Sequence, residues 1–230
     1  MTDPMPPTPD GRDSQGRDYV NVDKDRYLML ADKLLTILIP NRYSLTPRLL
    51  DVGCGAGFVV RAAKDQGFDA MGIDTYNDAI NYGKKVLKAP VRKIILYDFK
   101  PTNKFDVITL NHVFEHITET EKFLKNIKGL MKKDGVLLLS SPNYKSLMRM
   151  LFGDRWYGFQ ALQHVWQLTP KSLKKYLESQ GFTNIKFYPS SMDYNPPNII
   201  KNAVFRILNL GAKQIGLGDQ LVMTASKRAE

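Results

Sequence analysis

The segment LLDVGCGAGFVV, residues 49–60, is the strongest indication of architecture in this chain. An apolar run from Leu49 to Val52 leads into glycines at positions 53, 55 and 57, and a second apolar run follows. Glycine has no Cβ, so alternating glycines allow a tight turn and a close approach of backbone to a ligand. The segment therefore predicts a strand, a ligand-binding loop and a helix, in that order.

Outward from this segment, short apolar runs alternate with amphipathic ones. This rhythm predicts an α/β fold with a doubly wound, mostly parallel sheet. Strands are expected at 48–52, 69–74, 93–98, 105–111, 135–141, 184–189 and 219–226. Helices are expected at 22–40, 56–67, 77–87, 118–131 and 170–180.

Composition limits the protein class. A chain of 230 residues with 43% hydrophobic residues favours one domain, and a single cysteine excludes an intramolecular disulfide. We expect a disordered tail over 1–18, a single domain over 19–230, and a cytoplasmic location, because neither a secretory signal nor a membrane-spanning apolar run is visible. The net charge of +10 favours anionic partners such as nucleic acid, phosphorylated substrates or an anionic lipid surface, although a merely solvated surface would carry the same charge.

The glycine spacing bears on the cofactor. A dinucleotide fingerprint needs a third glycine at position 58, where this chain has Phe58. The pattern is instead Gly-x-Gly-x-Gly, with Asp51 two residues before the first glycine. Nicotinamide enzymes fit this pattern poorly.

The pattern resembles the class I S-adenosylmethionine-dependent methyltransferases, whose first motif reads much like DVGCGAG. Later motifs follow in order: GIDTY, LYDF and FDVITLNHVFEHI. The resemblance implies a Rossmann-like, seven-stranded sheet with helices on both faces and an antiparallel last strand. It also implies S-adenosylmethionine as cofactor, bound by Asp51, Gly53, Cys54, Gly55, Gly57, Asp74, Thr75, Asp98, Phe99, Asn111 and His112.

Simpler roles stay open for some of these residues. Asp74 would also serve as a cap for the helix that begins near Asn77, and Asp98 as a turn residue before Pro101. Cys54 needs no chemistry, since a small residue fits between two glycines.

The segment HVFEH, residues 112–116, has the residue order of inverted zinc peptidases. Zinc catalysis requires three protein ligands, and the chain has only one other histidine, His164, and no acid that stands out as a third ligand. The segment also directly follows a strand, where the resemblance assigns it to the donor pocket. We therefore expect no metal site.

The histidines suit a different role. Transfer of a methyl group to a hydroxyl requires loss of a proton, and histidine can accept one near neutral pH. His116 and His164 are the candidate catalytic bases. Alternatively, both are buried imidazoles that shape the loop.

The segment 143–168 is rich in aromatic residues and methionine. Together with the helix that follows, it resembles bacterial O-methyltransferases of quinones, sugars and lipid-linked glycans, a likeness that spans about 48–186. It predicts a lid over an acceptor with an apolar body and an anionic part, or else a helical hairpin on the core. Its members are Tyr144, Met148, Leu151, Phe152, Trp156, Tyr157 and Phe159, interleaved with Lys145, Arg149 and Arg155.

An insertion at 196–216 has a basic amphipathic pattern. Ile200, Val204 and Ile207 recur on one side, and Lys201 and Arg206 take the other. Such a helix would make a peripheral membrane contact through 199–213, cover the sheet, or contact a partner chain.

Together these features predict a methyltransferase that modifies a hydroxyl on a small-molecule or lipid-linked acceptor, such as a quinone, sugar or glycan. Methylation of RNA or protein is the rival activity. Against nucleic acid, no RNA-binding domain is evident, and Asn111–Phe114 does not match the Asn-Pro-Pro-Tyr-like motif of many amino-directed nucleic-acid enzymes. A non-catalytic partner protein that binds S-adenosylmethionine is the alternative of another class. The sequence does not indicate an oligomeric state.

Overall fold

The computed structural model describes residues 24–38, 46–156, 158–160, 162–191, 207–208 and 210–228. The expected tail over 1–18, Tyr157 and most of the 196–216 insertion lie outside the described residues. The chain divides into two compact units. Unit 1 runs to Thr109 and includes 130–132, and unit 2 contains 110–129 and 133–230.

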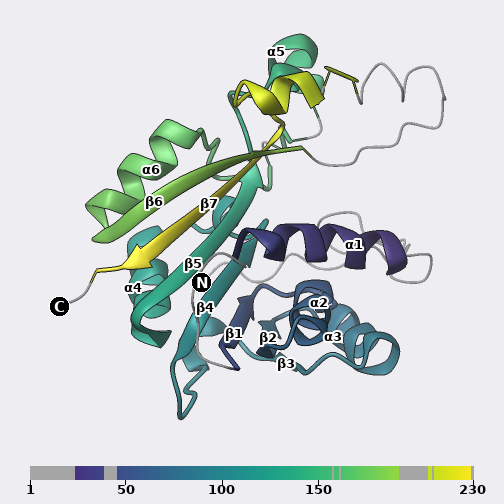
Figure 1. Cartoon of the computed structure of the whole chain (residues 1–230), viewed down its shortest axis with the longest axis vertical. Coiled ribbons are helices and arrows are strands. Elements are labelled where there is room, and N and C mark those ends of the chain that lie inside the picture. Colours follow the sequence, from purple (N-terminus) through teal and green to yellow (C-terminus); the bar gives the residue numbers. More distant parts are fainter. Residues whose placement is uncertain are drawn as a thin grey trace. The chain divides into compact units, whose positions relative to one another are not determined.

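Seven strands form a sheet in the order β3-β2-β1-β4-β5-β7-β6 (Figure 1). In unit 1, β1 (Arg48–Val52) pairs in parallel with β2 (Asp69–Asp74) and with β4 (Phe105–Asn111), and β2 pairs in parallel with β3 (Val91–Lys93). In unit 2, β7 (Gln220–Lys227) runs antiparallel to both β5 (Met131–Pro142) and β6 (Phe182–Ser190). The expected α/β class, the mostly parallel seven-stranded sheet and the antiparallel last strand are confirmed.

Helices of unit 1 pack beside its strands. They are α1 (Lys24–Leu35), the 3-10 turn η1 (Thr36–Leu38), α2 (Phe58–Asp65), α3 (Asn77–Tyr82) and the π-helix η2 (Gly83–Leu87). In α2, Val59, Val60, Ala62 and Ala63 are buried, as the apolar spacing predicts. The Phe58 ring stacks on Tyr27 of α1 at 5.1 Å between centroids and lies 6.3 Å from Tyr82 of α3, which joins the three helices.

Unit 2 has its own helices. They are the 3-10 turn η4 (Phe114–His116), α4 (Thr120–Leu130, whose last residue belongs to unit 1), α5 (Leu147–Phe152), the 3-10 turn η5 (Gly153–Arg155) and α6 (Pro170–Ser179). Residues 207–208 and 210–214 are also helical. The helix α6 begins with a capping box, in which Thr169 and Ser172 each bond the other's backbone N–H.

One strand prediction is wrong. The apolar run 93–98 predicts a strand, but β3 ends at Lys93 and Leu96–Asp98 form the 3-10 turn η3. β3 is an edge strand that pairs only with β2, and the ladder stops where β2 stops, at Asp74. Leu96 becomes buried from the turn, so its apolar side chain does not need a strand.

Candidate functional site

The glycine loop between β1 and α2 has the geometry that its sequence predicts. Gly53, Gly55 and Gly57 have φ values of 70°, 51° and 82°, a region that side chains rarely occupy. At Gly57 a Cβ would also lie 2.7 Å from Cγ1 of Val91. The loop therefore needs glycine for its turn and for its close packing on β3.

Most amides of this loop bind within the protein. The N–H groups of Gly53 and Cys54 both donate to the Ile73 carbonyl, at 2.9 and 3.1 Å, and Gly57 N–H donates to the Cys54 carbonyl at 2.8 Å. What remains for a ligand is the bare glycine backbone and the start of α2, which has no side-chain cap. The loop thus offers close approach more than a row of amide donors.

Asp74, at the end of β2, fixes this loop. Its Oδ2 accepts from Gly55 N–H at 2.7 Å, and its Oδ1 accepts from Tyr76 N–H at 2.8 Å. Each carboxylate oxygen has a second lone pair, so Asp74 can hold the loop and still accept from a vicinal diol. The alternative role as a cap of α3 is not seen, because the N-cap of that helix is Tyr76 and no side chain caps it.

Asp51 is a residue of β1, two positions before Gly53. It is 2% exposed, and its Oδ1 accepts from the Thr109 hydroxyl at 2.6 Å. Burial raises the pKa of Asp51 to about 7, because desolvation outweighs the Thr109 hydrogen bond and the charge of Asp74 adds repulsion. Asp51 is thus joined through its side chain to β4.

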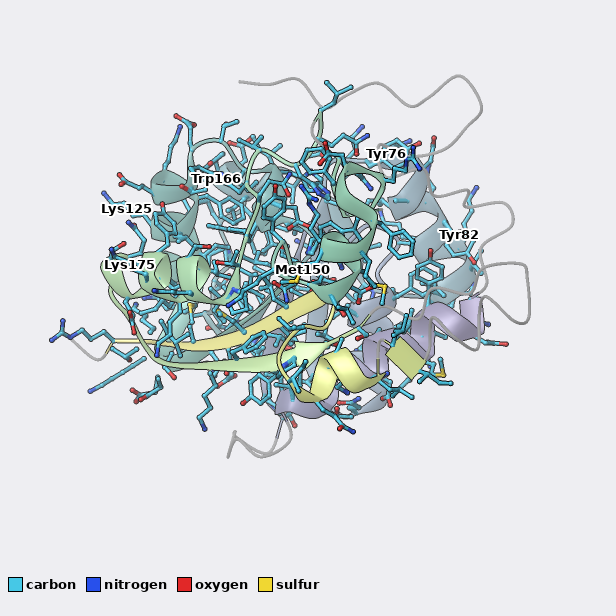
Figure 2. All side chains as sticks on the ribbon, turned by 90° about the horizontal axis from the view of Figure 1, so that it is seen from above. Tyr76, Tyr82, Lys125, Met150, Trp166 and Lys175 are labelled. Atoms are coloured by element: carbon cyan, nitrogen blue, oxygen red, sulfur yellow. The ribbon has the colours of Figure 1, made fainter. Side chains whose placement is uncertain are left out.

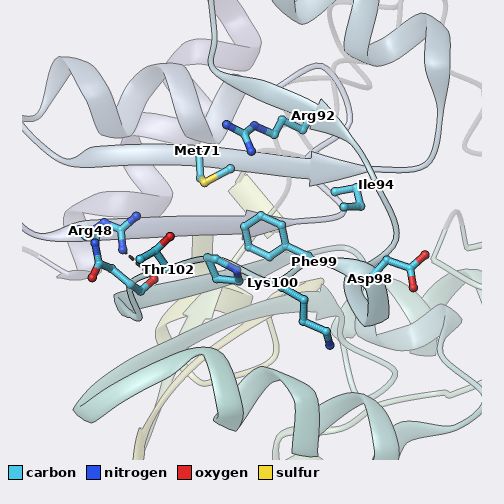
Figure 3. Close-up of a pocket in the computed structure, with 10 residues that line it drawn as sticks. Arg48, Met71, Arg92, Ile94, Asp98, Phe99, Lys100 and Thr102 are labelled. Atoms are coloured by element: carbon cyan, nitrogen blue, oxygen red, sulfur yellow. Dashed lines mark hydrogen bonds between the residues drawn. The ribbon is translucent and has the colours of Figure 1, made fainter.

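The remaining predicted cofactor residues of unit 1 are Cys54 of the loop, Thr75, Asp98 and Phe99. Thr75 is exposed, and the buried Cys54 sits against Gly72, where it fills space. Asp98 and Phe99 line a cavity of about 450 Å³ together with Arg48, Met71 and Arg92 (Figure 3). Neither the glycine loop nor Asp51 nor Asp74 lines this cavity. Phe99 is buried and stacks on Phe105 at 6.3 Å between ring centroids.

Asn111, the last residue of β4, and His112, which follows it, belong to unit 2. Asn111 Oδ1 accepts from the Ser140 hydroxyl, and His112 N–H donates to the Ser140 carbonyl at 3.0 Å. His112 has φ 55°, and helical turns resume only at Phe114. His112 and His116 therefore do not share a helix face, as zinc-peptidase ligation would require.

His112 holds Glu115 in place. Its Nδ1 lies 3.2 Å from Glu115 Oε1, and its Nε2 lies 3.1 Å from Gln220 Nε2. A proton on Nδ1 satisfies both contacts, because the ring then donates to the carboxylate and accepts from the amide. Burial alone would raise the pKa of Glu115, but the hydrogen bond from His112 is among the interactions that outweigh it, so that pKa lies below its usual value.

Glu115, His116 and His164 form a cluster. Their ligand atoms all lie within 4.8 Å of one another, and the two imidazole rings meet edge to face at 4.8 Å between centroids. His116 Nδ1 lies 2.9 Å from the Gln163 carbonyl and His164 Nδ1 lies 3.0 Å from the Gly158 carbonyl. Carbonyls only accept, so both Nδ1 atoms carry protons and both Nε2 atoms present lone pairs. Burial also lowers the pKa of His164, which favours its neutral form.

The 158–166 segment is tied to this cluster by further hydrogen bonds. Trp166 N–H donates to the Glu115 carbonyl at 3.2 Å, and its indole Nε1 donates to the Ile117 carbonyl at 2.7 Å. Trp166, labelled in Figure 2, thereby joins the segment to the η4 turn. The approach of His164 to His116 is consequently a fixed feature of unit 2.

The predicted lid segment has an inner and an outer part. Met148 and Trp156 are buried, whereas Leu151 and Phe152 are exposed, as is Met150 (Figure 2). The Arg149 guanidinium lies 4.7 Å from the Tyr144 ring centroid and 5.2 Å from that of Phe159. This cation–π arrangement positions a basic group among aromatic rings.

The sequence did not single out two residues at this cluster, Glu115 and Gln220. Glu115 was visible only as part of the HVFEH pattern, and Gln220 had no signal at all, since it lies 108 residues after His112.

No helix among the described residues has the length and apolar character to cross a membrane.

Known proteins resemble this chain in sequence. The profile of a methyltransferase-domain family matches residues 22–186. The chain is 30% identical, over 65% of its length, to a ubiquinone biosynthesis O-methyltransferase of Rhodopseudomonas palustris strain HaA2, and the match covers 62% of that protein. A protein of the same name from Actinobacillus pleuropneumoniae serotype 7 is 31% identical over 46% of this chain and 51% of its own length. The chain thus spans about half to three fifths of these relatives.

Solved structures share the fold. A methyltransferase from Archaeoglobus fulgidus that depends on S-adenosylmethionine superposes with a TM-score of 0.62 at 22% identity, covering 91% of this chain and all of that one. The plantazolicin methyltransferase BpumL in complex with S-adenosylhomocysteine gives a TM-score of 0.60 at 17% identity, covering 91% and 88% of the two chains. At these identities the likeness concerns the fold.

Proposed function

Because this chain belongs to the methyltransferase-domain family and has the fold of S-adenosylmethionine-dependent methyltransferases, we propose that it transfers a methyl group to a hydroxyl oxygen of a small or lipid-linked acceptor. The observation that carries the choice of oxygen is the likeness, at about 30% identity, to proteins named as O-methyltransferases of ubiquinone biosynthesis. A quinone precursor, a sugar and a lipid-linked glycan are acceptors of this chemical class.

The residues of unit 1 would bind the donor. The glycine loop lets a ligand lie directly against the backbone, and Asp74 has lone pairs left for the ribose hydroxyls. S-Adenosylmethionine supplies the methyl group on a sulfonium carbon. Methyl transfer is an in-line displacement, so alignment of donor and acceptor provides much of the rate.

The acceptor hydroxyl must lose its proton during transfer. Among the described residues of unit 2, His116 and His164 supply groups suited to this task, since the Nδ1–H of each imidazole is bonded to a carbonyl and Nε2 is left to accept a proton. We therefore propose His116 and His164 as the catalytic histidines, which would take up the proton directly.

The lipid-linked part of the proposal has its own support. The described residues among 207–215 present large apolar side chains to solvent, with Ile207 at 69% and Ile215 at 71% exposed. Lys213 adds positive charge to this segment, and such a surface suits an anionic bilayer or an acyl chain. Sedimentation with vesicles containing anionic lipid should recover the wild type, and Ile207→Ser with Ile215→Ser should reduce the recovery.

The test of the proposed function is a transfer assay with several acceptors. Purified protein and methyl-labelled S-adenosylmethionine are incubated with polyprenylated catechols, lipid-linked sugars, RNA or a protein extract. We expect label in a hydroxyl-bearing small or lipid-linked molecule, with mass spectrometry placing the methyl on oxygen, and Asp74→Ala as the donor-site control. Label confined to RNA or protein would overturn the proposal, and donor binding without any transfer would indicate a non-catalytic binding protein.

A further inference from the structure

We propose that Glu115, His116 and His164 bind one divalent transition-metal cation. They are the only group of three or more potential ligands that the described residues bring together, and their ligand atoms lie within 4.8 Å of one another. Two imidazole nitrogens and one carboxylate oxygen are the ligand set of several catalytic zinc sites and of non-haem iron sites. The sequence predicted no metal, because it showed only one histidine outside HVFEH and no acid that stood out as a further ligand.

The lone pairs that face the cluster are unused. Glu115 Oε2 and His116 Nε2 are buried and have no hydrogen-bond partner among the described residues. Glu115 is 1% exposed, so its carboxylate oxygen is removed from solvent. Buried polar atoms normally find a partner, and leaving two adjacent acceptors without one is unfavourable. A cation would satisfy both atoms at once.

Surrounding contacts orient all three ligands as in metal centres. The Nδ1–H groups of His116 and His164 donate to the carbonyls of Gln163 and Gly158, which leaves each Nε2 as the ligating atom. Histidine ligands in metal sites almost always donate their other N–H to a carbonyl or carboxylate. Glu115 receives the corresponding support from His112, which is itself held by Gln220.

The distances between the ligand atoms indicate how the three side chains would have to move to bind an ion. Ligand atoms at the corners of a zinc tetrahedron are roughly 3.4 Å apart, given zinc–nitrogen distances of about 2.0–2.1 Å. The present limit of 4.8 Å is wider, so the side chains would have to rotate inward around the ion. Three protein ligands also leave at least one coordination position open.

The open position suggests what the ion does, and this step rests on the proposed function. A bound divalent cation lowers the pKa of a coordinated hydroxyl, so that the acceptor oxygen would release its proton to water and then form its bond to the methyl carbon as the bond from carbon to the donor sulfur breaks. His116 and His164 would then act as ligands. The metal-binding inference itself needs no acceptor.

Cobalt is the probe for the test. Tag-free full-length protein is stripped with a chelator and titrated with Co²⁺, whose visible absorption changes when nitrogen and carboxylate ligands replace water. We expect one Co²⁺ per chain, displaced by Zn²⁺. The chain contains only three histidines, His112, His116 and His164, so histidine ligation elsewhere cannot produce this signal.

Variants identify the ligands. His164→Asn and His116→Asn keep a side-chain N–H donor for the Gly158 and Gln163 carbonyls but remove Nε2, and each should weaken Co²⁺ binding by more than ~100-fold, as should Glu115→Gln. His112→Ala, which removes the support of Glu115, should weaken it ~10- to 100-fold. Glu119→Gln, at an exposed carboxylate four residues from Glu115, should leave binding unchanged.

The metal site and the proposed methyl transfer can be refuted independently. An aqueous-type Co²⁺ spectrum, or wild-type affinity in both Asn variants, would overturn the metal site even if the stripped protein binds S-adenosylmethionine in calorimetry. Co²⁺ binding that depends on the three ligands, without methyl transfer to any hydroxyl, would overturn the proposed function and leave the site standing. Near-ultraviolet circular dichroism verifies that each variant is folded, and Zn²⁺ should raise the Tm of the wild type but not of the Asn variants.

Discussion

The substitution Asp51→Asn should change the pH dependence of stability. In the folded chain Asp51 has a pKa of about 7, against 3.8 for the ordinary carboxyl, because it is buried. The folded protein therefore retains this proton up to a higher pH than the unfolded chain. Its contribution to stability is greatest at low pH, declines as the pH rises from about 4 to about 7, and is constant above that.

The size of this loss of stability follows from the pH interval over which the folded chain holds one more proton than the unfolded chain. Each pH unit in which the folded chain holds one extra proton costs about 1.4 kcal/mol as the pH rises. Between pH 5 and pH 7 the interval is two units, so the wild type should lose about 3 kcal/mol through Asp51. An asparagine keeps an oxygen for the Thr109 hydroxyl but does not titrate, so the variant should lack this decline.

Urea unfolding followed by circular dichroism, at pH 5, 6, 7 and 8, measures the effect. The free energy of unfolding of Asp51→Asn minus that of the wild type should increase by about 3 kcal/mol from pH 5 to pH 7 and then level off. Asp65→Asn, at an exposed carboxylate that pairs with Arg61, controls for the chemistry of the substitution. A difference between Asp51→Asn and wild type that is the same at all four pH values would refute the reasoning.

Three further substitutions test the donor site, the glycine loop and the cap of α6. Asp74→Ala should weaken S-adenosylmethionine binding by about 1–3 kcal/mol in calorimetry, because the ribose hydroxyls and the Gly55 N–H lose their acceptor, and unchanged affinity would remove Asp74 from the donor site. Gly57→Ala should lower the free energy of unfolding by about 1–3 kcal/mol more than Gly67→Ala in urea titrations. Both glycines have positive φ, but only at Gly57 does the new Cβ meet Val91, so equal losses would mean that backbone strain alone matters. Thr169→Ala should cost about 1 kcal/mol by removing the cap of α6, and an unchanged urea midpoint would show that the capping box contributes nothing.

The sequence predicted the parallel half of the fold well because its signals are local. The strands at 48–52, 69–74 and 105–111 match β1, β2 and β4, since each is an apolar run bounded by turn residues. The run 93–98 failed because its apolar side chains are buried from a 3-10 turn beside an edge strand. Periodicity alone cannot distinguish these two ways of burying an apolar run.

The candidate site likewise has one part that the local sequence predicts and one part that only the fold reveals. The glycine loop was predictable, because alternating glycines directly after a strand are typical of a tight turn that admits a ligand to the backbone. The cluster of Glu115, His116 and His164 was not, because 48 residues separate the two histidines and only the fold brings them together (164 − 116 = 48). Glu115 and His116 lie within HVFEH, and the structure adds His164 as the third proposed ligand.

The position of β7 affects how the chain is made. β5 and β6 do not pair with each other, and each forms its ladder with β7, which lies between them. β7 is the last of the seven strands in the sequence, beginning 78 residues after β5 ends (220 − 142 = 78). During synthesis β5 and β6 therefore wait with open edges, which are prone to pairing with other chains. A slow step in the synthesis of the residues between β6 and β7 would prolong that exposure, so the yield of native protein in the cell should depend on how promptly residues 220–227 follow.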